Sequence, residues 1–230
     1  MKIVPIILGL FHSQSVLDVG CGLGTWLSAF RQLGVADVIG IDGEYVDRDS
    51  LFIPRQLFRQ HDLVAPLDLK RTFELVLSLE VAEHLPESAA DTFVESLVRH
   101  GDIIVFSAAI PGQIGTHHVN EQYPSYWTRK FGERSFELFD IIRPIVWHDP
   151  DVALCYKQNV LAFVRNPSAA QQSLKAADQR ALLLDVVHPE HYEHVQTFTA
   201  NVGRLLSFSP STYALAERVL IAARNLRHSS

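Results

Sequence analysis

This chain of 230 residues has few cysteines, no excess of basic residues and no long apolar run. Its two cysteines, Cys21 and Cys155, lie far apart, so we expect no disulfide framework and a reduced, cytoplasmic setting. The 20 basic residues are outnumbered by 26 acidic ones, which gives a net charge of −6. A broad basic surface for nucleic acid is therefore not expected. No apolar run approaches the roughly 20 residues that a membrane span requires, so no membrane partner is expected.

The apolar segment Ile3–Phe11 follows Met1 and Lys2, as in a signal peptide. It has no small-residue cleavage site and runs within a few residues into the first core strand. We therefore predict a short helix packed on the edge of a sheet. The 47% hydrophobic content supports a well-buried core, and the length fits one α/β domain with an appendage.

The stretch from Val16 to Trp26 has the strongest pattern in the chain. Its apolar start predicts a buried strand, and Trp26, Leu27 and Phe30 follow at helical spacing. Between strand and helix, an acid precedes three glycines at alternate positions: Asp18, Gly20, Gly22 and Gly24. Glycines allow a sharp turn and a close approach of the backbone to a ligand. Strand, glycine turn and helix are the first unit of a doubly wound sheet, whose ligands bind beyond the strand ends.

The rest of the first 166 residues alternates between strands and helices. We predict strands at 37–43, 56–61, 73–79, 102–108, 136–142 and 158–164, and helices at 86–99 and 124–134. The last two strands are expected to form an antiparallel pair. Asp42 ends the second strand about 20 residues past the glycine loop, where such folds place an acid on ribose hydroxyls. A turn aspartate before Gly43 is the simpler alternative.

A cluster of acids and histidines follows the fourth strand. If the segment is helical, Glu80, Glu83 and His84 share one face, because positions i, i+3 and i+4 lie side by side. With His118 from the loop after the fifth strand, they form a plausible ligand set for a divalent cation, most simply Mg²⁺ or Mn²⁺. Loop-holding and packing roles explain the same residues equally well. His117 and His118 are also the best candidates for a catalytic base, because an unperturbed histidine pKa is near 6.5.

Taken together, residues 16–164 resemble the class I S-adenosylmethionine (SAM) methyltransferases, close to the group related to ubiquinone-pathway O-methyltransferases. The acid followed by G-x-G-x-G resembles their first motif. It differs from the dinucleotide-binding fingerprint G-x-G-x-x-G, in which two residues separate the second and third glycines. The resemblance implies a Rossmann-like sheet, mostly parallel with an antiparallel final hairpin. It also implies SAM contacts from Asp18, Gly20, Gly22, Gly24, Asp42, Asp62, Leu63 and Glu80. Asp62 would meet the adenine amino group, and the backbone N–H of Leu63 the ring.

The Glu80–His84 stretch with a later histidine is similar to the metal-binding residues of some of these enzymes and of small-RNA 2′-O-methyltransferases. The expected reaction is methyl transfer to a small-molecule acceptor, at oxygen, with base or metal assistance, and the sequence leaves transfer to nitrogen open. RNA ribose methylation and SAM binding without catalysis remain alternatives. The acidic balance argues against RNA.

From about Pro167 the sequence becomes rich in Ala, Gln, Leu and charge, with helical periodicity over 173–187 and 211–227. We predict a methyltransferase domain at 1–166 and a helical appendage at 167–230, which provides packing, a lid or a homodimer contact. The histidines at 188, 191 and 194 are spaced three apart and rotate around a helix, which disfavours a metal site there.

Overall fold

A computed structural model of the chain describes residues 2–113, 115–176 and 184–206. Its strands are β1 (Ser15–Val19), β2 (Asp37–Asp42), β3 (Phe58–Gln60), β4 (Leu75–Leu79), β5 (Ile103–Ser107), β6 (Phe136–Phe139) and β7 (Leu161–Arg165). Its helices are α1 (Ile3–Phe11), α2 (Thr25–Gln32), α3 (Ala90–Val98), α4 (Pro124–Gly132), α5 (Arg143–Val146), α6 (Leu154–Asn159), α7 (Ala169–Ala176) and α8 (Pro189–Leu206). Three 3₁₀ turns lie at Arg55–Leu57, Ala82–His84 and Glu87–Ala89.

The seven strands form one sheet in the order β3-β2-β1-β4-β5-β7-β6. Pairs β1–β2, β1–β4, β2–β3 and β4–β5 are parallel, whereas β7 runs antiparallel to both β5 and β6. The predicted fold class, including the antiparallel final hairpin, is confirmed. Because the strand order reverses beside β1, the carboxyl ends of β1 and β4 define the edge where ligands bind in such sheets.

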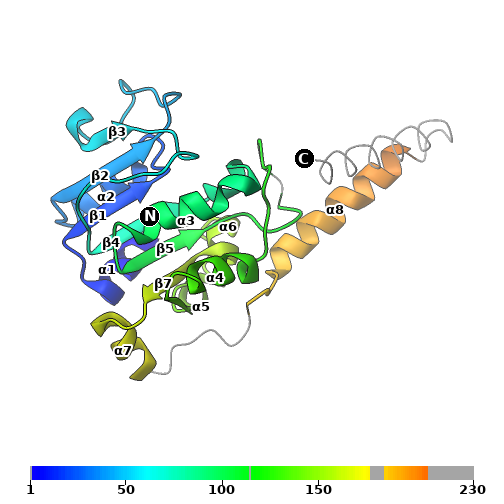
Figure 1. Cartoon of the computed structure of the whole chain (residues 1–230). Coiled ribbons are helices and arrows are strands. Elements are labelled where there is room, and N and C mark those ends of the chain that lie inside the picture. The colour runs from blue at the N-terminus through cyan, green and yellow to red at the C-terminus, as the bar shows by residue number, and fades with distance from the viewer. Residues whose placement is uncertain (1, 114, 177–183, 207–230) are drawn as a thin grey trace. The chain divides into compact units, whose positions relative to one another are not determined.

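Helices cover both faces of the sheet, as Figure 1 shows. The strands are apolar on both faces, as expected for buried parallel strands, so alternate residues enter two separate cores. Apolar residues of α1, α2, α5, α6 and α7 pack in one core, and those of α3 and α4 in the other. The N-terminal segment is helical as predicted. However, Ile3, Val4 and Ile7 pack into the first core on a face of the sheet, and not on its edge.

The chain divides after His188, and not after residue 166 as the sequence suggested. Within the first unit, Ala170 and Leu174 of α7 pack against the core. The side chain of Gln158 donates to the carbonyl of Val186 at 2.7 Å and accepts the N–H of His188 at 2.6 Å. These contacts make residues 167–176 and 184–188 part of the sheet domain.

The second unit begins at Pro189, and the structure describes its helix α8. The predicted helix at 211–227 and the homodimer contact assigned to the C-terminal helices involve residues outside the described part of the chain. In the described ranges, no helix combines the length and the apolar character needed to cross a membrane.

Candidate functional site at the carboxyl edge of the sheet

The glycine loop follows β1 in a conformation that requires its glycines. Gly20, Gly22 and Gly24 have φ values of 85°, 53° and 78°, in the left-handed region that side chains disfavour. A Cβ on Gly20 would lie 2.3 Å from Val81, which follows β4. The N–H groups of Gly20 and Cys21 both donate to the carbonyl of Ile41. The loop is therefore tied to the end of β2 and packed against the segment after β4.

Asp42 at the end of β2 is 2% exposed, and its carboxylate has three donors. The N–H of Gly22 donates to Oδ2 at 2.6 Å, and the N–H of Gly43 donates to Oδ1 at 2.7 Å. The hydroxyl of Tyr45 also donates to Oδ1. Asp42 therefore connects β2 with the glycine loop, which fits an acid placed beside a ligand.

Asp18 on β1 is 1% exposed, and its Oδ2 has no hydrogen-bond partner among the described residues. Burial, and to a lesser extent the neighbouring charge of Asp42, together raise the pKa of Asp18 to about 8. A buried acceptor atom without a partner is rare in folded proteins. This oxygen is therefore a candidate contact for a bound ammonium or hydroxyl group.

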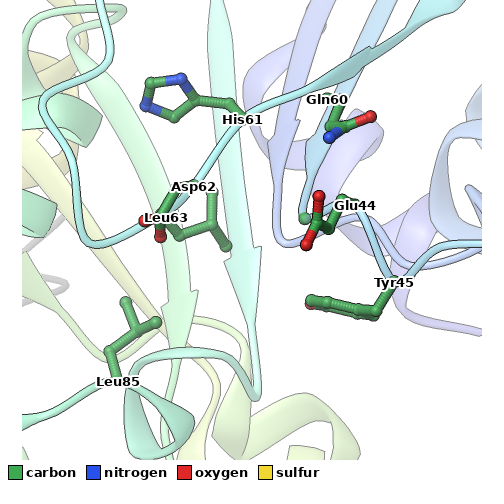
Figure 2. A pocket seen from close by; sticks show the side chains of 8 residues that line it. Glu44, Tyr45, Gln60, His61, Asp62, Leu63 and Leu85 are labelled. Carbon is green, nitrogen blue, oxygen red and sulfur yellow. The ribbon is translucent and has the colours of Figure 1, made fainter.

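A cavity of about 600 Å³ opens beside the ends of β2 and β3. Figure 2 shows Glu44 and Tyr45 on one side of it and Asp62, Leu63 and Leu85 on the other. Its lining residues are Gly43, Glu44, Tyr45, Gln60, His61, Asp62, Leu63 and Leu85. Two predicted cofactor contacts thus line the cavity, whereas the glycine loop does not. Oδ1 of Asp62 accepts the N–H of Val64 at 3.1 Å, so Asp62 also stabilises the turn that follows β3.

Three of the four predicted metal ligands converge. One ligand atom from each of Glu83, His84 and His118 lies within 4.8 Å of the others, and the two imidazole centroids are 5.0 Å apart. Glu83 is 0% exposed, and neither of its oxygens has a hydrogen-bond partner in the described ranges. Burial, followed by the nearby charge of Glu80, raises the pKa of Glu83 to about 8.

Glu80 lies outside this group because the segment is not helical there. Its φ is 56°, and the 3₁₀ turn begins only at Ala82, so the expected i, i+3, i+4 face does not form. The Glu80 carboxylate instead accepts the side-chain amides of Gln113 at 2.7 Å and Asn159 at 3.1 Å. Asn159 also donates to the amide oxygen of Gln113 at 2.8 Å. The sequence gives no sign of either amide contact, because nothing in the spacing of Gln113 and Asn159 relates them to Glu80.

The two loop histidines differ in their surroundings. Nδ1 of His118 lies 3.0 Å from Oε1 of Glu121, and Oε2 of Glu121 accepts the N–H of Gly112 at 3.0 Å. With an N–H at Nδ1, His118 presents Nε2 as its free nitrogen. His117 is exposed, and its carbonyl oxygen lies 3.3 Å from Nδ1 of His84. The sequence carried one cue for Glu121, its position three residues after His118.

Comparison with known proteins supports the fold described above. A profile of the methyltransferase domain matches residues 3–106. A ubiquinone biosynthesis O-methyltransferase of Rhodopseudomonas palustris (strain TIE-1) is 32% identical over 92 residues, which are 36% of this chain. The aligned region covers only 34% of that relative's length.

Two solved structures show the same fold. The methyltransferase domain of bacterial CtHen1 aligns with a TM-score of 0.51 at 19% identity, covering 70% of this chain and 95% of the other. The sugar N-methyltransferase KedS8 from Streptoalloteichus sp. ATCC 53650 aligns with a TM-score of 0.53 at 17% identity, covering 71% and 85%. Residues 3–106 thus match a methyltransferase domain, and the whole sheet has the Rossmann-like fold of the class I SAM-dependent methyltransferases.

Proposed function

We propose that this chain transfers the methyl group of SAM to a hydroxyl oxygen of a small-molecule acceptor. One observation carries the proposal. The buried acid at the end of β2, its adjoining cavity and the cluster of Glu83, His84 and His118 all follow strands that end at the same edge of the sheet. This edge offers room for a nucleoside beside groups that can take or weaken a hydroxyl proton.

In this proposal the cofactor lies along the strand ends. Asp42 accepts the ribose hydroxyls, and the cavity receives the adenine between Asp62, Leu63 and Leu85. Oδ2 of Asp18 has no hydrogen-bond partner among the described residues and is near Asp42. Asp18 therefore contacts the amino-acid end of SAM in this proposal, directly or by holding the glycine loop.

The chemistry is an in-line displacement at the sulfonium methyl. The acceptor oxygen forms a bond to the methyl carbon as the carbon–sulfur bond breaks, and the products are the methyl ether and S-adenosylhomocysteine (SAH). Holding the oxygen and the methyl group in line contributes about 7–11 kcal/mol. Where no cation is bound, the acceptor proton passes to Nε2 of His118, whose other nitrogen faces Glu121. His117 is the second candidate base.

Glu83, His84 and His118 also fit a divalent cation, because the buried Glu83 carboxylate lacks partners and both histidines have a nitrogen close to it. A cation held there would supply charge that lowers the pKa of an acceptor hydroxyl. One carboxylate with two imidazoles favours Mn²⁺ or a later transition metal over Mg²⁺. The same three residues support RNA ribose methylation as a second candidate, which the net charge of −6 disfavours.

The first test is calorimetric binding of SAM and SAH, followed by transfer of labelled methyl to panels of hydroxylated metabolites and to RNA. We expect micromolar binding and a hydroxylated small molecule as acceptor. Failure to bind SAM would overturn the proposal. Binding without transfer to any acceptor would favour a non-catalytic SAM-binding protein, and transfer to RNA alone would favour the second candidate.

A second test separates the roles of the two acids. Mn²⁺ binding is followed by electron paramagnetic resonance in Glu83→Gln and in Glu80→Gln as its matched control. We expect loss of Mn²⁺ binding in Glu83→Gln and retention in Glu80→Gln. Equal loss in both variants would make Glu80 a fourth ligand, and no binding in the wild type would remove the metal and leave His118 as the base.

A further inference from the structure

The carboxylate of Asp42 is almost fully occupied. It accepts the N–H groups of Gly22 and Gly43 and the hydroxyl of Tyr45, and it is 2% exposed. A carboxylate offers about four acceptor positions. Three are taken here, so a ribose diol that presents two hydroxyls to Asp42 cannot be satisfied while all three donors stay in place.

Of these donors, Tyr45 is the one that can leave. The two amides belong to the backbone that forms the glycine loop and the end of β2, whereas Tyr45 lies in the following turn and is 79% exposed. Its departure would lose little buried apolar area. Burial of the hydroxyl and the Asp42 charge raise the pKa of Tyr45, so it remains a protonated donor at neutral pH.

The ring of Tyr45 also lies directly over Gly43. A Cβ at position 43 would be 2.4 Å from Cε1 and 2.7 Å from Cδ1 of that ring. The ring can occupy this place because residue 43 is glycine. Glu44 and Tyr45 lie on one side of the cavity (Figure 2), and Gly43 also lines it.

We propose that the Tyr45 hydroxyl occupies the ribose position on Asp42 in the free protein, and that a nucleoside-containing cofactor must displace it in order to bind. This inference rests on the proposed function, because it takes SAM or SAH as the ligand at Asp42. Tyr45 is then a built-in competitor that keeps Asp42 hydrogen-bonded when the site is empty and lowers the affinity for the cofactor.

The test measures the dissociation constant of SAH by calorimetry. Tyr45→Phe removes the competing hydroxyl and keeps the ring, so we expect SAH to bind on the order of tenfold more tightly than to the wild type. Tyr192→Phe removes another exposed phenol and is the matched control, with unchanged affinity expected. Unchanged or weaker binding in Tyr45→Phe would overturn the inference.

A double-mutant cycle supplies an independent measurement. Gly43→Ala places a methyl group against the Tyr45 ring and should push the hydroxyl off Asp42. Any direct clash of this methyl with SAH is common to both backgrounds. We therefore compare the effect of Gly43→Ala on SAH affinity in two backgrounds, one with Tyr45 and one with Tyr45→Phe. The effect should be more favourable in the background with Tyr45, and the difference should equal the fold-change found for Tyr45→Phe alone.

An equal effect in both backgrounds would overturn the inference. If the wild type binds no SAH at all, the proposed function fails with it. If the wild type binds SAH but the two comparisons show no gain, the role of Tyr45 alone is refuted.

Discussion

Replacing Asp42 with alanine tests the cofactor site most directly. In the bound state the variant loses the acceptor for two ribose hydroxyls, whereas in the free state it loses the acceptor for the Tyr45 hydroxyl. The net loss corresponds to a hydrogen bond to a charged group, about 1.5–3 kcal/mol. We therefore expect SAH affinity to fall roughly tenfold to a hundredfold.

The same substitution should weaken the fold, because the N–H groups of Gly22 and Gly43 lose their acceptor at 2.6 and 2.7 Å. Each part-buried amide left without a partner costs about 1–3 kcal/mol, reduced where water can enter. Urea denaturation should show this loss in free energy of unfolding, and calorimetry on the folded variant should show the loss of SAH affinity.

Asp47→Ala is the matched control, since Asp47 is an exposed acid of the same loop that accepts the N–H of Asp49 at 3.0 Å and the hydroxyl of Ser50 at 2.6 Å. It should leave SAH binding unchanged. A folded Asp42→Ala protein that binds SAH like the wild type would refute the assignment of Asp42 to the ribose.

Three further predictions concern the surroundings of the site. Glu121→Ala should weaken Mn²⁺ binding roughly tenfold to a hundredfold, because His118 loses the partner that orients its ring. Electron paramagnetic resonance measures this binding, and unchanged Mn²⁺ affinity would contradict the orienting role of Glu121. His100 is buried, with Nδ1 2.6 Å from the Ser96 carbonyl and Nε2 accepting the N–H of Leu69 at 2.9 Å, and burial lowers its pKa. The unfolded state then binds a proton at His100 more readily than the folded state does, so the free energy of unfolding should fall as the pH drops below about 6.5. Denaturant titrations at several pH values should show that His100→Gln reduces this pH dependence. A chain ending after His188 should keep SAH binding. A chain ending after residue 166 should unfold at a lower urea concentration, because it lacks α7, which packs on the core. Equal urea midpoints for the two truncated chains would contradict this.

The sheet was predictable because its strands have a simple physical signature. Buried parallel strands are short apolar runs between turn residues, and each expected strand lies within a few residues of an observed one. The domain boundary was less accessible. The Ala- and Gln-rich sequence of α7 looks the same whether the helix packs on a sheet or forms an appendage, and only tertiary contacts such as that of Leu174 distinguish the two.

Within the site, the sequence indicated residue types but not backbone conformation. The spacing of Glu80, Glu83 and His84 places the three side chains on one face only if the segment is helical. The left-handed φ of Glu80 could not be predicted, because glutamate, unlike glycine, does not indicate that conformation. The contact of Tyr45 with Asp42 is similarly hidden, because a tyrosine three residues after an acid can point in many directions.

The left-handed conformation of Glu80 connects three segments of the sheet domain. A non-glycine residue held in the left-handed region costs about 1–3 kcal/mol, and here the backbone N–H of Glu80 is fixed by the carbonyl and hydroxyl of Ser107. Glycine would adopt this conformation at less cost but would leave Gln113 and Asn159 without their shared carboxylate. Three linked hydrogen bonds join the loop after β5, the end of β4 and the last residue of α6, which precedes β7. Because these bonds share their groups, breaking one weakens the other two, so the three segments are held together as one cooperative unit.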